Sequence, residues 1–107
     1  MTDKIVVFVM VGNPNDAAVL AKSLVEKRLA ACVNLVPGAT SWYWWDGKVA
    51  EDQEVLLIVK TSRHKFASLE KEVVRLHSYA VPEVVAIQIV EGSKNYLNWI
   101  EESLKEE

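Results

Sequence analysis

The sequence predicts an α+β fold in which a four-stranded antiparallel sheet carries two helices on one face. Three observations support this prediction. Strand-like and helix-like segments follow one another in the order βαββαβ, an Asp-Gly pair joins two long strand-like segments, and a further amphipathic segment closes the chain as a helix. The 107 residues match the size of one ordinary domain without repeats or low-complexity segments, so we expect a single domain over residues 1–107.

The first half of the pattern is a strand followed by a helix. Lys4–Val11 is a nearly unbroken, β-branched apolar run, which is typical of a central strand buried on both faces. Gly12–Asn15 has turn composition, and Asn15 or Asp16 is expected to cap the helix that follows. The inward face of that helix is read from apolar residues three and four apart, namely Ala17, Leu20, Ala21, Leu24 and Val25.

A long hairpin follows this helix. Ala30–Val36 reads as a second strand, which Pro37-Gly38 interrupts as a bulge before Ala39–Trp45 continues it. Asp46-Gly47 predicts a tight hairpin turn, because glycine tolerates the positive φ of a type I′ turn. Lys48–Lys60 returns as the third strand.

The pattern closes with a helix, a strand and a last helix. Thr61 or Ser62 is expected to cap a helix whose inward residues are Phe66, Leu69, Val73 and Leu76. Residues 77–83 form a loop, and Val84–Val90 is the fourth strand. Gly92-Ser93 leads into a last helix, whose inward face is expected to carry Tyr96, Trp99, Ile100 and Leu104. With right-handed crossovers, this order predicts a ferredoxin-like sandwich.

Composition and charge exclude several classes of partner. The net charge is −3 without a basic stripe, so we expect no nucleic-acid binding. The longest apolar run is too short to span a bilayer, so we expect no membrane association. The N-terminus lacks the features of a secretory signal, and Cys32 is the single cysteine, so we expect a cytoplasmic chain without intrachain disulfides.

The length of the hairpin predicts self-assembly. The first strand spans roughly 26 Å, whereas each hairpin arm spans roughly 50 Å, so the tip must project beyond the sheet. The tip carries four consecutive aromatic residues, which alternation places on both faces of the ribbon: Trp42, Tyr43, Trp44 and Trp45. We expect these side chains to form a subunit interface in a ring-like homo-oligomer. Alternatively, the hairpin folds back over its own domain, or the aromatic residues form the wall of a small-ligand site.

Residues that could carry catalysis are sparse. No P-loop, GxSxG, dinucleotide or zinc-protease motif is present. Cys32 and His77 are expected at opposite ends of the sheet, too far apart for a nucleophile and its base. We therefore predict that the protein is not an enzyme and that Cys32 is a buried small apolar residue.

The loop after the second helix contains the best candidate metal ligands. His77 and Glu83 together could hold Cu(II) or Zn(II). The alternative is that His77 caps the C-terminus of its helix. Lys60 could face a ligand cleft, or extend its charge into solvent at the end of its strand.

Several segments together resemble the CutA divalent-cation tolerance proteins. They are LAACVNLVPGATSWYWWDGKV, EDQEVLLIVKT, HSYAVPEVVA and YLNWIEESL, so the resemblance covers nearly the whole chain, from about Ile5 to Leu104. It implies a ferredoxin-like fold with extended second and third strands, a tight homotrimer similar to the PII signalling proteins, and a cytoplasmic role in tolerance of copper and other divalent metals. No enzymatic activity or organic cofactor is implied.

The resemblance extends to individual positions. The matching residues are Cys32, Tyr43, Trp45, Gly47, Lys48, Lys60, His77, Tyr79, Pro82 and Glu83. Ser78 stands where the family usually has proline, and Val9 and Leu76 stand where copper-binding members have a cysteine and a second histidine. We therefore expect at most a modest site for Cu(II) or another divalent cation, using His77 with Glu83 or Cys32. The alternatives are a PII-like small-ligand-binding signalling trimer and a trimeric scaffold for a partner protein.

Overall fold

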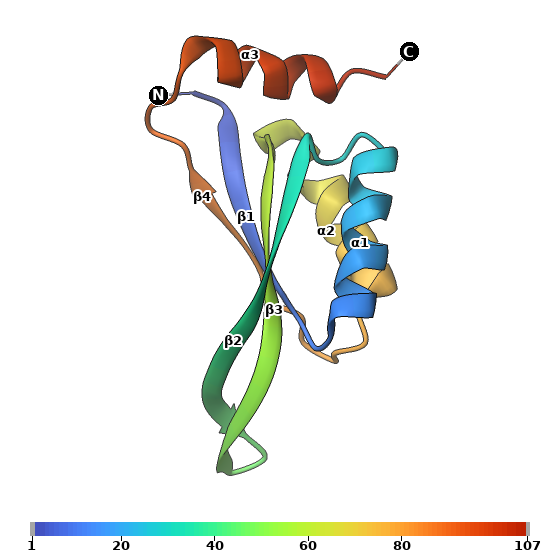
Figure 1. Cartoon of the computed structure of the whole chain (residues 1–107), viewed down its shortest axis with the longest axis vertical. Helices are drawn as coiled ribbons and strands as arrows, with labels where there is room; N and C mark the ends of the chain where they lie inside the picture. The colour runs from blue at the N-terminus through green and yellow to red at the C-terminus, as the bar shows by residue number, and fades with distance from the viewer. Residues whose placement is uncertain (1, 107) are drawn as a thin grey trace.

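A four-stranded antiparallel sheet in the order β2-β3-β1-β4 organises the structure, a computed structural model that describes residues 2–106 (Figure 1). The elements are β1 (Lys4–Val11), α1 (Pro14–Glu26), β2 (Cys32–Trp45), β3 (Lys48–Ser62), a 3₁₀ turn (Arg63–Lys65), α2 (Phe66–Leu76), β4 (Val84–Gln88) and α3 (Lys94–Ser103). Helices α1 and α2 lie on the same side of the sheet, and α3 crosses one end of it. The predicted ferredoxin-like α+β fold is confirmed. Within residues 2–106, no helix is long and apolar enough to cross a membrane.

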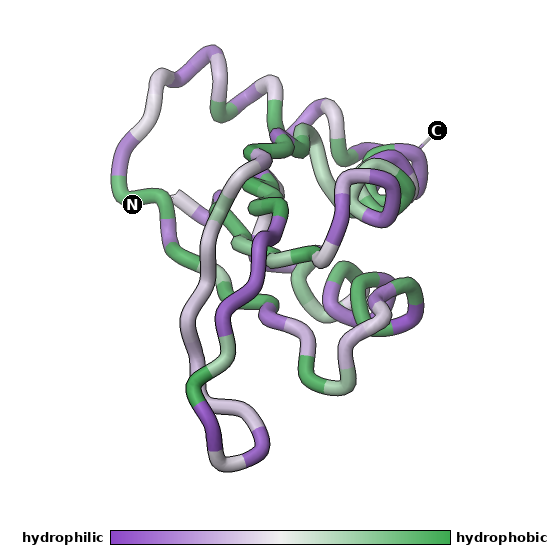
Figure 2. The backbone as a smooth tube through the Cα atoms, turned by 60° about the horizontal axis from the view of Figure 1, so that its bottom comes forward, coloured by the Kyte–Doolittle hydropathy of each residue, from purple (hydrophilic) through white to green (hydrophobic). Residues whose placement is uncertain are grey.

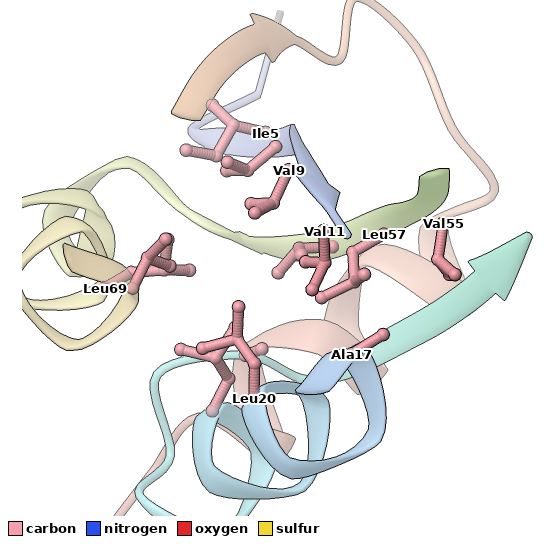
Figure 3. Close-up of a cluster of buried hydrophobic side chains, with 13 residues drawn as sticks. Ile5, Val9, Val11, Ala17, Leu20, Val55, Leu57 and Leu69 are labelled. Atoms are coloured by element: carbon pink, nitrogen blue, oxygen red, sulfur yellow. The ribbon is translucent and has the colours of Figure 1, made fainter. Parts of the chain in front are cut away.

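The main core lies between the sheet and its two helices. Alternate residues of β1 and β3 point toward α1 and α2, as the labelled side chains of Figure 3 show. The buried apolar residues of β1 are Ile5, Val7, Val9 and Val11, whereas Val6, Phe8 and Met10 are only partly buried. The prediction that β1 is buried on both faces was therefore wrong. The helices cover one face, and the other, which we call the open face, is less protected.

Helix α1 begins earlier than predicted. Asn13 is the N-cap, and its side-chain oxygen accepts a hydrogen bond from the Asp16 backbone N–H at 2.9 Å. Pro14 occupies the first turn, where its fixed φ suits the helix and its missing N–H costs nothing. Asn15 and Asp16 are therefore not caps. Val25 is exposed instead of inward, because it lies one position beyond the buried stripe that ends at Leu24.

The hairpin of β2 and β3 has the predicted turn and bulge. Asp46 and Gly47 have φ values of 54° and 76°, the signs that a type I′ turn needs. The register of β2 against β3 shifts between Val36 and Ala39, where Gly38 takes a φ of 80°. Strand β1 pairs with β3 only as far as Val55. The rest of β3 pairs with β2 alone, so the hairpin projects from the body of the molecule (Figure 2).

Three predictions in the second half needed correction. Ser62 precedes the 3₁₀ turn and makes no side-chain capping bond, while the Thr61 hydroxyl donates to the Leu29 carbonyl at 2.7 Å. Strand β4 ends at Gln88, two residues before the predicted end. Ile100 of α3 and its C-cap Leu104 are buried, whereas Tyr96 and Trp99 are exposed and stack on each other. A helix that crosses the end of a sheet buries a narrower stripe than one lying on its face.

A carboxylate at the α1–α2 contact joins the two helices. Glu72 is buried, and its Oε2 accepts hydrogen bonds from Ser23 Oγ at 2.6 Å, Lys27 Nζ at 2.9 Å and Arg75 Nη2 at 2.7 Å. These donors, Arg75 first, hold the pKa of Glu72 well below its usual value near 4.5. The ionised form is therefore stabilised in the folded state.

Replacing Glu72 with glutamine is expected to lower the free energy of unfolding at neutral pH by about 1–3 kcal/mol, because charged hydrogen bonds are lost. In the native protein, the Glu72 contribution is complete above its unfolded-state pKa and disappears as the pH falls toward its lower folded-state pKa. Urea unfolding at neutral and acidic pH should therefore show a smaller pH dependence for Glu72→Gln. The exposed Glu70→Gln on the same helix is the control. Equal behaviour of the two variants would contradict this role.

Candidate functional site

An open cleft of about 670 Å³ lies where the hairpin leaves the body of the domain. Its walls come from the hairpin, from the end of β1 and from the loop before β4. The lining residues are Met10, Ser41, Trp42, Tyr43, Trp45, Glu54, Tyr79, Ala80, Val81 and Glu83. The cleft therefore brings together three of the four hairpin aromatic residues and two of the loop residues predicted from the sequence.

Tyr79 and Glu54 fix the loop to the base of the hairpin. The Tyr79 hydroxyl donates to Glu54 Oε2 at 2.7 Å, and the Glu54 residue is only 7% exposed. Gly12 allows this approach, since a Cβ atom there would lie 3.1 Å from the Tyr79 hydroxyl oxygen. Burial first, and then the Glu54 carboxylate, raise the pKa of Tyr79. The phenol therefore stays protonated and keeps donating to the carboxylate.

A second tyrosine–carboxylate pair lies farther along the hairpin. The Tyr43 hydroxyl donates to the Asp52 carboxylate, which raises the pKa of Tyr43. Both residues of this pair are exposed. Asp52 and Glu54 are two positions apart on β3, so alternation places both on the open face of the sheet. The two pairs give this side of the hairpin a negative, hydrogen-bonded surface.

His77 lies beside the cleft without lining it. It is the C-cap of α2, and its Nε2 donates to the Met10 carbonyl at 2.7 Å. Its Nδ1 accepts the Tyr79 backbone N–H at 3.1 Å. These partners define a neutral ring protonated at Nε2. A metal ion at Nδ1 would have to replace the Tyr79 amide.

Glu83 and Pro82 are the other loop residues predicted from the sequence. Glu83 is exposed and lines the cleft, and Pro82 is half-buried between Val81 and Glu83. Within the part of the chain that the structure describes, no three histidine, cysteine, aspartate or glutamate side chains are gathered to hold a metal ion. A site built on His77 or Glu83 would therefore need ligands from outside a single chain.

Cys32 and Lys60 form a separate group at the other end of the sheet. Cys32 is half-buried, which corrects the prediction of a buried residue, because its side chain is on the open face. Its Sγ lies 3.8 Å from Asn34 Oδ1 and 4.0 Å from Lys60 Nζ, and Lys60 also hydrogen-bonds Asn34. Cys32 pairs with Lys60 opposite Val6, four residues from the Met10 carbonyl that holds His77. The structure therefore does not bring Cys32 and His77 together.

The hairpin aromatic residues are widely exposed in the single chain. The exposed fractions are 65% for Trp42, 74% for Trp44 and 57% for Trp45. The hairpin does not fold back over its own domain. The opposite edge of the sheet also exposes apolar side chains, Val85 and Ile87 of β4. Both edges of the sheet therefore present apolar surface to their surroundings.

The fold and the long hairpin define a ferredoxin-like α+β protein, and solved structures of that class are similar throughout. A divalent cation tolerance protein from Thermus thermophilus superposes with a TM-score of 0.91 at 53% identity, covering 94% of this chain and 97% of the other. The structure described as the periplasmic divalent cation tolerance protein CutA of Archaeoglobus fulgidus gives a TM-score of 0.93 at 40% identity, covering 95% and 99%.

Sequence comparison identifies the family. The model of the CutA1 divalent ion tolerance proteins matches residues 5–103, so this chain belongs to that family, as its motifs predict. The Thermus thermophilus protein is 54% identical over 98 residues, covering 92% of this chain and 95% of the relative. The chloroplastic rice protein CutA 1 is 47% identical over 102 residues, which is 95% of this chain but 58% of the rice protein. The chain thus spans little more than half of that plant relative.

Sequence reasoning placed Glu54 on the third strand but assigned it no role in the site. Its signal is a carboxylate directly before the apolar run of β3, at a position that alternation places on the open face. Its partner Tyr79 is 25 residues away, so the contact cannot be read from local spacing. Met10 was likewise read as a core position, although it lines the cleft.

Tyr79→Phe is expected to lower the free energy of unfolding by about 1–3 kcal/mol, because Glu54 is buried and loses its phenol donor. The exposed pair offers a matched control, in which Tyr43→Phe should cost less stability than Tyr79→Phe. Chemical unfolding at one fixed chain concentration measures both. Equal losses would show that the Tyr79–Glu54 bond does not hold the loop.

Proposed function

We propose that this protein is a non-enzymatic cytoplasmic homotrimer of divalent-cation tolerance, which binds Cu(II) or another divalent cation modestly at the loop over residues 77–83. Membership of the CutA1 divalent ion tolerance family is the observation that carries the proposal. The exposed hairpin and the placement of His77 and Glu83 support its two parts, assembly and metal binding.

Assembly is supported by the apolar edges of the sheet. Strands β2 and β4 are the two edge strands, and both carry exposed apolar side chains. Edge strands with such side chains tend to pair with another chain. When the edge of one copy meets the opposite edge of the next, a rotation that closes produces a ring. A ring of three would cover Trp44 in each copy.

Metal binding is supported by two donors on one loop. His77 has a neutral ring, the form that coordinates a metal ion, and Glu83 has an exposed carboxylate. Imidazole and carboxylate together suit Cu(II), for which additional ligands would come from a neighbouring copy or from water. The hydrogen bond from the Tyr79 amide competes for Nδ1, which favours modest affinity.

Light scattering of the purified protein is expected to give three times the chain mass. Trp44→Lys should lower that mass at micromolar concentration, because it places a charge in the proposed interface. Val19→Lys makes the same change at an exposed apolar position on α1 and should leave the mass unaltered. A monomeric native protein, or equal dissociation of both variants, would contradict the trimer.

Calorimetric titration with Cu(II) is expected to give about one site per chain, as one imidazole per chain in this loop would supply. His77→Ala and Glu83→Gln should each weaken binding, and Glu83→Gln does so without disturbing the His77 contact to the Met10 carbonyl. His64→Ala, on the exposed 3₁₀ turn, is the control. Unchanged Cu(II) affinity in both loop variants would remove the metal site from this proposal.

A second candidate function is small-molecule binding in the cleft, as in a PII-like signalling trimer. Its volume of about 670 Å³ lies within the range of small-ligand sites, and aromatic side chains line it beside a few polar groups. This candidate requires no metal ion.

A further inference from the structure

The cleft at the base of the hairpin has a distinctive chemical composition. Its walls combine three aromatic side chains, Tyr43, Trp45 and Tyr79, with the carboxylates of Glu54 and Glu83, and Trp42 also lines it. No lysine or arginine is among the lining residues that the structure describes. Aromatic faces carry negative electrostatic potential, as carboxylates do. All the charged and aromatic groups of the cleft therefore favour a positive ligand and disfavour an anion.

Glu54 is the carboxylate that a positive ligand in the cleft would stabilise most. It is almost completely buried, and one of its oxygens accepts the Tyr79 hydroxyl at 2.7 Å. Within residues 2–106, its other oxygen accepts no hydrogen bond from the protein and is open to the cleft instead of enclosed. An ionised carboxylate with an unfilled acceptor at the wall of a cavity is stabilised by a cation in that cavity.

The aromatic walls decide which kind of cation fits. A small metal ion requires several oxygen, nitrogen or sulfur ligands, and the described chain gathers no such group. An alkylated ammonium ion spreads its charge over an apolar surface and is bound by aromatic faces with few polar partners. The cleft is also far larger than a metal ion requires. Its size and lining match an organic cation.

We propose that the cleft binds a small organic ammonium cation, held by Trp45 and its aromatic neighbours and by the carboxylates of Glu54 and Glu83. This inference rests on the second candidate function, small-molecule binding, and shares one residue, Glu83, with the metal proposal. An organic ammonium ion would bind in the cleft without the help of a metal ion. The site would give the protein a response to organic amines in addition to its family role.

The test compares choline with 3,3-dimethyl-1-butanol, its neutral isostere, in which carbon replaces the ammonium nitrogen. Titrations of the full chain contain EDTA to remove metal ions and constant ionic strength. Choline is expected to bind saturably and at least about fivefold more tightly than the alcohol, as a cation–π contact supplies. The indole N–H resonance of Trp45 should shift with choline, whereas those of Trp44 and Trp99, which do not line the cleft, should not.

Variants assign the binding to these residues. Trp45→Leu and Glu54→Gln should each weaken choline binding about fivefold or more. Glu83→Gln should also weaken it, and its exposed position leaves folding intact. Trp44→Leu is the matched control, because Trp44 adjoins Trp45 on the opposite face of the ribbon and does not line the cleft.

Two outcomes would overturn the inference, and they differ in which hypothesis they reject. Equal affinity for choline and the alcohol would leave a small-molecule cleft but reject the cationic ligand class. Absence of saturable binding by both probes would reject small-molecule binding as well, as expected if a side chain of a second copy fills the cleft. Neither outcome decides the Cu(II) titration, because His77→Ala there tests a residue that does not line the cleft.

Discussion

The pairing of β1 with β3 stops at Val11 and Val55, and the distinctive parts of the structure depend on that limit. Strand β3 has 15 residues and β1 has 8, so nearly half of β3 lies beyond its central partner. There only β2 supports it, in a two-stranded ribbon that is marginally stable by itself in water. The ribbon compensates with large aromatic side chains, which bury much area once something covers them. The exposed tryptophans and the cleft at its base both follow from this difference in strand length.

The loop before β4 is positioned by contacts to the end of β1 and the start of the ribbon. His77 binds the Met10 carbonyl, and Tyr79 binds Glu54. These bonds hold the loop against the open face, where α1 and α2 give no cover. Of these two residues, His77 carries the metal hypothesis and Tyr79 forms part of one wall of the cleft. His77 uses both ring nitrogens for this purpose, which explains why positioning the loop and coordinating a metal ion compete at one side chain.

Features set by local chemistry could be predicted from the sequence, and features set by distant contacts could not. Asp46-Gly47 determines its turn through its own backbone preferences, and the Pro37-Gly38 interruption marks its bulge in the same way. Asn13 was missed because several polar residues compete as caps and only the entry angle of the chain selects one. The exposure of Trp99 depends on where α3 crosses the sheet. The partnership of Tyr79 with Glu54 depends on the folded loop, so the cleft could not be derived before the structure.

The bulge between Val36 and Ala39 determines on which face of the hairpin each later side chain of β2 lies. Val36 pairs with Leu56 and Ala39 with Glu54. Between these two pairs, β2 has two residues and β3 has one. Beyond this point, every β2 side chain has exchanged faces relative to an uninterrupted strand. Tyr43 and Trp45 thereby share a face with Asp52 and Glu54, while Trp44 faces the other way. Deleting or inserting one residue at the bulge would exchange the two sets of aromatic side chains without altering the composition of the tip. The number of residues in the bulge thus determines which aromatic side chains lie on the face of the carboxylates and which lie on the opposite face, where a neighbouring copy could contact them.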